Sequence, residues 1–182
     1  MSKILEILAS GFEEIEAVAP ADIWRRLGIE VTLAGLDDMQ ITGAHGMTLQ
    51  CDALLEEVSE LDFDGVFLPG GMPGSTNLRD SSVVREVVKR MASSGKVVSA
   101  ICAAPMVLSH CGVLRGKRFT MYPGMGDFLV SGDVPQSDSA VRDGNVVTGK
   151  GPGAAFFFAS EVAAALGVDA SACFEAMMME NK

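Results

Sequence analysis

One cysteine, Cys102, occupies a position suited to nucleophilic chemistry. The β-branched run 97–101 predicts a buried strand, and Pro105 fits the first turn of a helix, where its missing N–H costs nothing. The small residues Ala103 and Ala104 let the chain turn sharply between this strand and the helix, as in a nucleophile elbow. Because a helix N-terminus stabilises negative charge, we expect the thiol pKa to fall and the thiolate to react. A buried structural cysteine is the alternative, and the local sequence leaves both open.

The other three cysteines show no pattern of reactive or metal-binding sites. Cys51, Cys111 and Cys173 lie far apart, and no two cysteines form a CxxC pair. A disulfide framework and a cysteine zinc site are therefore not expected. We interpret these three residues as structural, since a free cysteine is most often a small buried side chain.

A nucleophile needs a proton partner, and the two histidines are poor candidates. His110 follows Cys102 by eight residues on the predicted helix, which places it roughly 12 Å away. It therefore suits the C-terminal end of that helix, before Gly112. His45 lies in a glycine-flanked loop, and the sequence does not determine where that loop goes.

A carboxylate is the other possible partner. Glu13 and Glu14 open the first predicted helix, where acidic side chains complement the helix dipole. Glu16 differs because it stands between the apolar residues Ile15 and Ala17. A carboxyl group partly buried there would have a raised pKa and could share a proton with the thiol of the reactive cysteine.

The elements that would position these residues alternate between strand and helix. Continuous Val/Ile/Leu-rich runs are typical of strands buried on both faces of a parallel sheet, so we predict a doubly wound, three-layer α/β fold. The predicted strands are 3–9, 30–35, 65–68, 96–101 and 118–121, and the predicted helices are 14–27, 82–93, 103–111, 154–166 and 170–179.

Shorter features complete the predicted architecture, which we interpret as one domain over residues 1–182. The segments 47–51 and 139–148 resemble short antiparallel pieces, and the second contains the hairpin signal Asp143-Gly144-Asn145. We therefore expect a mixed sheet or a small side hairpin. Three glycine-containing loops, at 10–11, 69–75 and 149–153, follow predicted strands and would form a pocket if they converge. Glycines that only turn tight corners are the alternative.

Composition narrows the classes of function. The chain has 182 residues, of which 48% are hydrophobic and 21% charged, so disorder is not expected. The net charge of −10 argues against binding to nucleic acid or an anionic membrane. The apolar run at 4–9 is too short and interrupted for a signal peptide or membrane span, which leaves the cytoplasm as the expected location. No phosphate-loop lysine motif or histidine ligand cluster occurs, so we expect no cofactor and no metal.

The chain resembles the ThiJ/PfpI superfamily, and within it the branch of the Parkinson's-disease-linked protein deglycase. The order and spacing of several motifs carry this resemblance over nearly the whole chain. These motifs are Gly11-Phe12-Glu13-Glu14-Ile15-Glu16, Pro20-Ala21-Asp22-Ile23, Arg25-Arg26-Leu27-Gly28-Ile29-Glu30-Val31, Leu68-Pro69-Gly70-Gly71, Ala100-Ile101-Cys102-Ala103-Ala104-Pro105 and Gly151-Pro152-Gly153.

The resemblance implies a flavodoxin-like sandwich, with a mostly parallel sheet and a small antiparallel hairpin, that forms a homodimer. It implies that Cys102 is the reactive cysteine and that Glu16 is a protonated acid hydrogen-bonded to its thiolate. The backbone N–H groups of Gly71 and Ala103 would form the equivalent of an oxyanion hole. Many members carry a histidine where this chain has Tyr122, and tyrosine is a poor base near neutral pH.

Two functions from different classes follow. The first is a cofactor-independent enzyme of the glyoxalase or deglycase type, acting on methylglyoxal-like dicarbonyls or their adducts through Cys102, Glu16, Gly71 and Ala103. The second is a peroxide-sensing protein or chaperone in which Cys102 is oxidised to sulfinate. A peptidase or amidotransferase is disfavoured, because both would need a histidine paired with the nucleophile.

Overall fold

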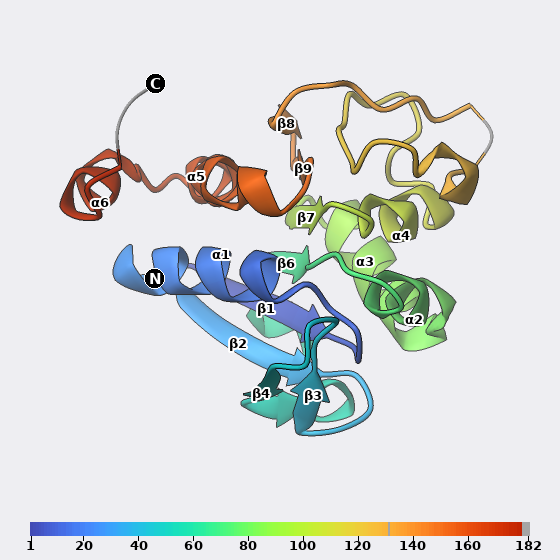
Figure 1. The fold of residues 1–182 in the computed structure, drawn as a ribbon, viewed down its shortest axis with the longest axis horizontal. Helices are drawn as coiled ribbons and strands as arrows, with labels where there is room; N and C mark the ends of the chain where they lie inside the picture. The colour runs from blue at the N-terminus through green and yellow to red at the C-terminus, as the bar shows by residue number, and fades with distance from the viewer. Residues whose placement is uncertain (131, 180–182) are drawn as a thin grey trace.

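The computed structural model describes residues 1–130 and 132–179. Its centre is a seven-stranded sheet with the order β5-β2-β1-β6-β7-β9-β8 (Figure 1). Neighbouring strands run parallel except β8 and β9, which are antiparallel. The strands of this sheet are β1 (Lys3–Leu8), β2 (Glu30–Gly35), β5 (Ala53–Leu54), β6 (Gly65–Leu68), β7 (Val97–Ile101), β8 (Ala140–Asp143) and β9 (Val146–Gly149).

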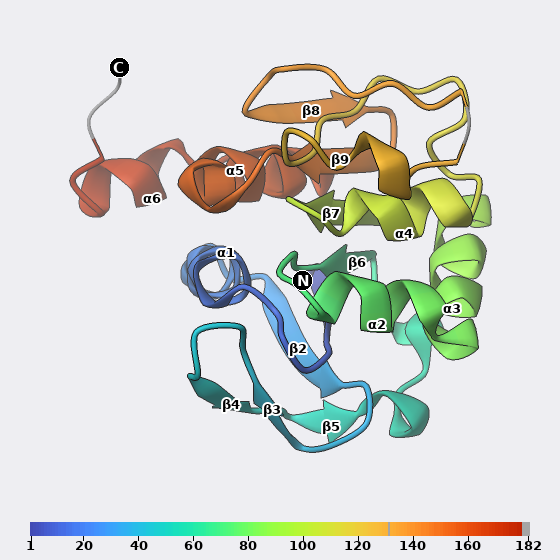
Figure 2. The ribbon, with the colours of Figure 1, turned by 45° about the vertical axis from the view of Figure 1, so that its right-hand side comes forward.

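Helices cover both faces of the sheet. One face carries α1 (Glu14–Arg26), α5 (Ala155–Ala165) and α6 (Ser171–Ala176), and the other carries α2 (Gly74–Asp80), α3 (Ser82–Ser93) and α4 (Pro105–His110) (Figure 2). Short 3-10 helices occur at Leu55–Glu57, Glu60–Asp62, Gly126–Phe128 and Pro152–Ala154. The predicted three-layer sandwich, with a mostly parallel sheet and an antiparallel hairpin, is confirmed.

Apolar spacing decides how the helices pack. In α3, four buried residues recur at intervals of three or four, namely Val84, Val87, Val88 and Met91, and form one face against the sheet. The hydroxyl of Ser81 caps this helix by accepting the N–H of Val84. None of the helices among the described residues is long and apolar enough to span a membrane.

Helix α1 is anchored to α5 through Trp24. Its side chain is fully buried, and its indole Nε1–H donates to the carbonyl oxygen of Ala159 at 2.9 Å. The ring meets that of Phe67 edge to face, with centroids 5.1 Å apart, and Phe158 completes the aromatic cluster. This packing fixes α1, the helix whose first turn carries the candidate acid.

The predicted strand 118–121 is wrong. Its only pairing is a single bridge between Thr120 and Gln136. The sheet edge next to β9 is occupied by β8, so this segment satisfies its N–H groups through side chains instead. Arg118 donates to Asp143 Oδ2 at 3.0 Å, and Thr120 donates to Thr148 Oγ1 at 2.9 Å.

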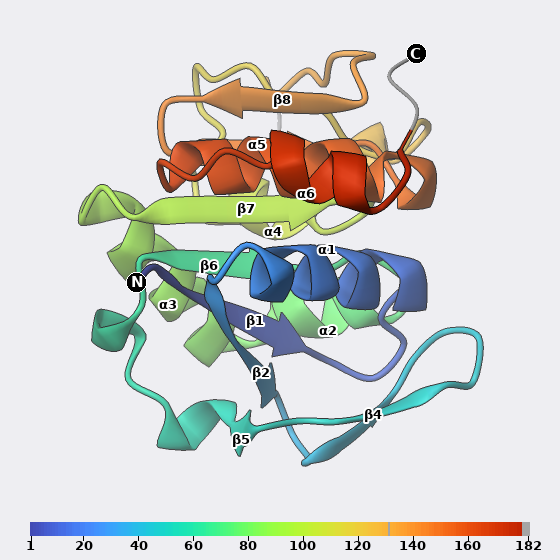
Figure 3. The same ribbon diagram turned by 90° about the vertical axis from the view of Figure 1, so that its left-hand side faces the viewer.

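Other predicted elements differ mainly at their ends. The helix expected at 103–111 begins only at Pro105, because the chain turns at 102–104, and the one expected at 170–179 ends at Ala176. Helix α2 and strand β5 were not predicted. The expected antiparallel pieces are both present. Strands β8 and β9 form a hairpin in the main sheet, with β8 at its edge (Figure 3). Strand β4 (Thr48–Gln50) pairs with β3 (Gln40–Thr42) in a separate two-stranded sheet (Figure 1).

The central strand β1 contains a buried acid, Glu6. Glu6 pairs with Leu33 of β2 on one side and with Phe67 of β6 on the other, so it lies in the interior of the sheet and not at an edge. Its carboxyl group is fully buried, and neither oxygen has a hydrogen-bond partner among the described residues. Burial raises the pKa of Glu6 well above its usual value of 4.5, although the charge of Arg25 works in the opposite direction. Folding therefore favours the protonated, neutral form of Glu6.

Replacing Glu6 by leucine should stabilise the protein, and more so at high pH. The unfolded chain releases this proton near pH 4.5, whereas the folded chain keeps it, so the free energy of unfolding falls as pH rises from there to the folded pKa. At pH 8 we expect a gain of roughly 1–3 kcal/mol for Glu6→Leu in urea denaturation, and a smaller gain at pH 4. The exposed Glu30→Leu is the matched control. A gain independent of pH would contradict a neutral, buried Glu6.

Candidate active site at the β7–α4 turn

Cys102 lies on a sharp turn directly after β7. Its backbone φ is +63°, in the left-handed region, which costs a residue with a Cβ roughly 1–2 kcal/mol. Two hydrogen bonds hold the turn: the N–H of Cys102 donates to the Gly149 carbonyl at 2.9 Å, and the carbonyl of Cys102 accepts the N–H of Tyr122 at 2.8 Å. The side chain is 9% exposed, so the sulfur is held in a fixed position close to the surface. The elbow expected from the sequence is present.

Two consecutive glycines allow the chain to approach this turn closely. A Cβ on Gly70 would lie 2.4 Å from Oε2 of Glu16 and 2.6 Å from Cβ of Cys102. A Cβ on Gly71 would lie 2.3 Å from the backbone nitrogen of Glu13, and the φ of Gly71 is +91°. Neither position can hold a larger residue without moving the backbone, so the pair is required for the site geometry.

The three glycine-containing loops converge at this place, as predicted. The loop after β1 contacts the loop after β6, because the N–H of Gly74 donates to the carbonyl of Gly11 at 3.2 Å. A Cβ on Gly11 would meet Pro73 Cδ at 2.4 Å. The loop after β9 joins them through the bond from Cys102 to Gly149. The ends of the four strands β1, β6, β7 and β9 thus meet around one thiol.

Glu16 supplies a buried carboxyl group to the thiol. Its side chain is fully buried, and Oε2 accepts the N–H of Gly70 at 2.9 Å. Oε1 has no hydrogen-bond partner within normal limits among the described residues. Burial raises the pKa of Glu16 to about 7; its interactions with Cys102 and with the Gly70 N–H lower it, and the nearby charge of Glu13 raises it. Near neutral pH this carboxyl group can therefore hold a proton or release it.

The expected fall in the thiol pKa is wrong. Burial raises the pKa of Cys102, and the negative charge of Glu16 raises it further. The backbone N–H groups of Gly71 and Ala103 lower the pKa of the thiol, but not enough to offset burial. The helix N-terminus alone predicted a lowered pKa, because the local sequence does not show how deeply the thiol is buried.

The carboxyl group and the thiol titrate as a pair. Two acids in contact lose their protons in two steps that belong to the pair. The first proton leaves near pH 7, and the second leaves well above the usual range of a thiol. Near neutrality the pair thus has one negative charge and one proton to share, and the form with the proton on Glu16 is a thiolate next to two N–H donors. The four residues expected at the site, Cys102, Glu16, Gly71 and Ala103, are together.

Tyr122 lies beside the elbow, at the position where a histidine was expected from the resemblance. Its side chain is half exposed, and its ring lies 3.3 Å from where a Cβ on Gly151 would stand. With Lys150 and Pro152 it lines a cavity of about 480 Å³ over the loop after β9. The phenol group can donate a hydrogen bond toward this cavity.

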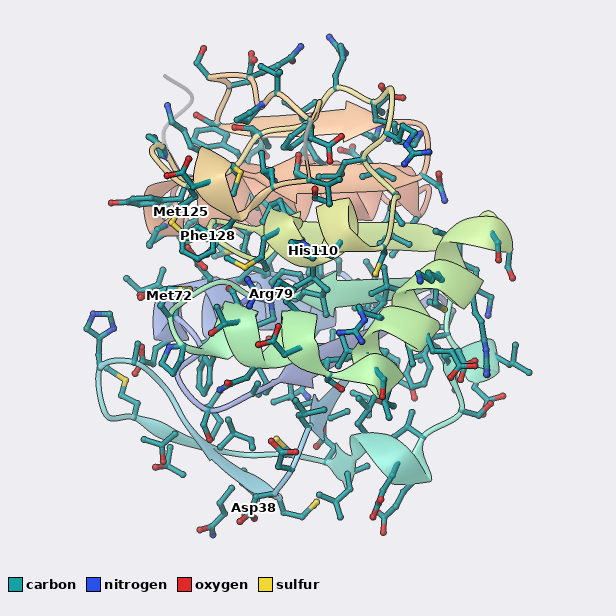
Figure 4. The ribbon with its side chains drawn as sticks, turned by 90° about the vertical axis from the view of Figure 1, so that its right-hand side faces the viewer. Asp38, Met72, Arg79, His110, Met125 and Phe128 are labelled. Atoms are coloured by element: carbon teal, nitrogen blue, oxygen red, sulfur yellow. The ribbon has the colours of Figure 1, made fainter. Side chains whose placement is uncertain are left out.

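His110 is the last residue of α4, as expected. Its Nδ1 lies 2.9 Å from the carbonyl oxygen of Met106, one turn earlier, and its side chain is exposed. Figure 4 shows His110 on the same side of the molecule as Arg79 of α2. It forms no pair with Cys102.

The sequence did not reveal what Glu14 and His45 do. Glu14 is buried, and its carboxylate accepts the N–H groups of His45 and Met47 through Oε1 and lies 2.9 Å from His45 Nδ1 through Oε2. The same Nδ1 is 3.4 Å from Glu13 Oε2. A Cβ on Gly43 would lie 2.4 Å from Glu14 Oε1. Gly43, two residues before His45, was therefore the one feature of the sequence that could have indicated the close approach of this loop to Glu14. These three side chains bring ligand atoms within 4.8 Å of one another, but they are already paired with each other.

Known proteins are similar to this chain in sequence and in fold. The DJ-1/PfpI family model matches residues 2–165. The protein dj-1beta of Drosophila melanogaster is 42% identical over 166 residues, which covers 90% of this chain and 89% of that protein. A deglycase of Pyrococcus abyssi is 39% identical over 153 residues, covering 83% and 91% of the two chains.

A solved structure agrees with this assignment. Oxidised DJ-1 of Toxoplasma gondii superposes with a TM-score of 0.92 and 31% identity, and the match covers 100% of both chains. The resemblance inferred from the motifs is therefore confirmed: this chain belongs to the DJ-1/PfpI family.

Proposed function

We propose that this protein is a cofactor-independent, stress-protective enzyme of the glyoxalase or deglycase type that acts in the cytoplasm on methylglyoxal-like dicarbonyls or their adducts. The observation that carries the proposal is the fully buried Glu16 carboxyl group in contact with the Cys102 thiol, with a pKa of about 7. Its relatives include proteins named deglycases, which supports this class of reaction.

The first step would be addition to the aldehyde. The Cys102 sulfur forms a bond to the aldehyde carbon of methylglyoxal, and the electron pair of the C=O bond moves to oxygen. The N–H groups of Gly71 and Ala103, which favour negative charge on the sulfur, would stabilise the charge that develops on this oxygen. The proton on Glu16 then moves to that oxygen, which gives a hemithioacetal and leaves a carboxylate.

The second step would move a proton between two carbons. The Glu16 carboxylate removes the proton from the carbon bound to sulfur, which gives an enediolate, and the hydroxyl proton on that carbon passes to the neighbouring oxygen. Return of the proton to the neighbouring carbon gives a thioester of lactate. Water hydrolyses the thioester, releasing lactate and the free thiol, so the net reaction is methylglyoxal plus water to lactate. One group acting as acid and as base needs a pKa near the working pH, as Glu16 has.

Lactate production from methylglyoxal tests this proposal directly. Wild-type protein should form many lactates per molecule, because the thiol is regenerated. Cys102→Ser should reduce product to background, and Glu16→Gln should lower the rate by roughly 100-fold or more, since it removes the acid and base together. Product must be counted, because any thiol or amine consumes methylglyoxal without turnover.

Cys111→Ser serves as the matched control for the lactate assay, since this half-buried cysteine lies on α4's C-terminal side away from the elbow and should leave the rate unchanged. If wild-type protein forms no more lactate than Cys102→Ser, the enzymatic proposal is wrong.

A peroxide-sensing role is the second candidate, and the unpartnered Oε1 of Glu16 favours it. The thiolate would attack one hydrogen peroxide to give a sulfenate and water, and a second hydrogen peroxide would convert the sulfenate to the sulfinate with release of a second water. A protonated Glu16 can then donate a hydrogen bond to a sulfinate oxygen. A related DJ-1 of Toxoplasma gondii was solved in an oxidised form, which supports such chemistry in this family.

Mass spectrometry after peroxide treatment tests the sensing role. We expect two oxygen atoms to be added to the peptide containing Cys102 before any other cysteine gains one. Glu16→Gln should slow this addition and shift the product beyond sulfinate, because the amide cannot share its proton with the thiolate in the same way. Preferential oxidation of Cys51 or Cys173 would count against the sensing role.

We also propose that the protein is a homodimer through the outer surface of α1. Ile15 and Val18 of α1 are 54% and 47% exposed, and they line an almost entirely apolar cavity of about 460 Å³ with Met47, Phe156 and Met177. Exposed apolar surface of this kind is typical of an interface between chains.

The mass in solution tests the dimer. Val18→Glu should convert the protein to a monomer in light scattering after size-exclusion chromatography, because it places a charge in the apolar surface. Val83→Glu is the matched control, since Val83 is 50% exposed on α3, on the opposite face of the sheet. A monomeric wild-type protein would refute the proposal.

A further inference from the structure

The loop between β3 and β4 reaches the start of α1 and places His45 next to two carboxylates. We propose that His45 is a positioning residue for the candidate site: by pairing with Glu13 it offsets the negative charge that Glu13 places near the buried pair of Glu16 and Cys102. This inference rests on the same thiol and carboxyl group as the proposed function, but it concerns their protonation and not turnover.

The pairing of His45 is specific in its geometry. Its Nδ1 lies 2.9 Å from Oε2 of Glu14 and 3.4 Å from Oε2 of Glu13, and its backbone N–H donates to Oε1 of Glu14 at 2.7 Å. The carboxyl group of Glu14 is buried, whereas the imidazole is well exposed, so Glu14 anchors the loop and the ring remains in exchange with water. Protonated His45 brings a positive charge to two negative ones.

A short chain of hydrogen bonds connects Glu13 to the site. The N–H of Glu13 donates to the carbonyl of Gly70 at 2.9 Å, and the N–H of Gly70 donates to Oε2 of Glu16, also at 2.9 Å. The absent Cβ of Gly71 lets the backbone of Glu13 approach this peptide to a distance no other residue would permit. Gly70 is therefore hydrogen-bonded to Glu13 through its carbonyl group and to Glu16 through its N–H group.

The charges act in opposite directions. The negative charge of Glu13 raises the pKa of Glu16, whereas the hydrogen bond with Glu14 and the charges of Glu13 and Glu14 raise the pKa of His45 above its ordinary 6.5. These two carboxylates, both from the start of α1, are the charged groups that face His45; Glu16 is faced by Glu13 and by the Cys102 thiol. When His45 loses its proton, Glu13 is no longer offset, and Glu16 should hold its own proton more strongly.

The rate at which iodoacetamide modifies Cys102, measured between pH 5 and pH 9 by mass spectrometry of its peptide, tests the inference. His45→Gln should move the first inflection of the profile upward by roughly 0.3–1 pH unit, the size expected from one partly screened charge near the site. Glu13→Gln should move it downward. His45→Lys keeps a positive charge at all these pH values and should restore or lower the wild-type inflection.

A double variant separates charge from structure. In the background of Glu13→Gln, replacement of His45 by Gln should shift the inflection less, because without the charge of Glu13 the pKa of His45 is lower and the imidazole carries less positive charge near neutral pH. A shift of the same size in both backgrounds, or a failure of His45→Lys to rescue, would overturn the inference. His110→Gln is the matched control, as it removes the other histidine, on the far end of α4, and should leave the profile unchanged.

The experiment is independent of the proposed function. Alkylation reports the protonation of the pair whether or not lactate is formed. If wild-type protein makes no lactate but the profiles shift as expected, the proposed function fails and the role of His45 stands. If lactate forms and the profiles coincide, the role of His45 fails alone.

Discussion

The contact between a fully buried carboxyl group and a nearly buried thiol is the constraint on which the site depends. Burial alone would keep both groups neutral and unreactive. The N–H groups of Gly70, Gly71 and Ala103 oppose this by stabilising a single negative charge shared by Glu16 and Cys102. The pair can therefore carry one proton and one charge near neutral pH, which suits either proton transfer or oxidation.

The arrangement of the parallel strands brings these N–H donors together around the thiol. Four parallel strands end around Cys102, and the segments after β6 and β7 supply the N–H groups of Gly70, Gly71 and Ala103. The strained φ of Cys102 is tolerated because Gly149 and Tyr122 bind its backbone from both sides. Packing of Trp24 between α1 and α5 fixes the helix that carries the acid. A site made of backbone N–H groups is rigid because the sheet itself is rigid.

The sequence predicted the layers, most strands and the elbow, because these depend on local patterns: continuous apolar runs, helix-starting proline and small residues around Cys102. It misplaced 118–121, because whether an apolar run pairs depends on which strand occupies the sheet edge, and β8 already does. It also missed the direction of the thiol pKa and the partner of Glu14. Both depend on contacts between segments distant in the chain, which no local pattern encodes.

The resemblance to the family implies a histidine where this chain has Tyr122, and this difference bears on how the thiol is activated. A histidine near the thiol would carry positive charge at moderately low pH and favour the thiolate directly. This chain has Tyr122 at that position, and the backbone N–H groups of Gly71 and Ala103 are the groups that favour negative charge on the sulfur. Glu13 precedes the first turn of α1 and raises the pKa of Glu16, and His45 of the β3–β4 loop lies 3.4 Å from the Glu13 carboxylate. The charge next to the buried pair therefore comes from the start of α1 and from the loop that packs on it.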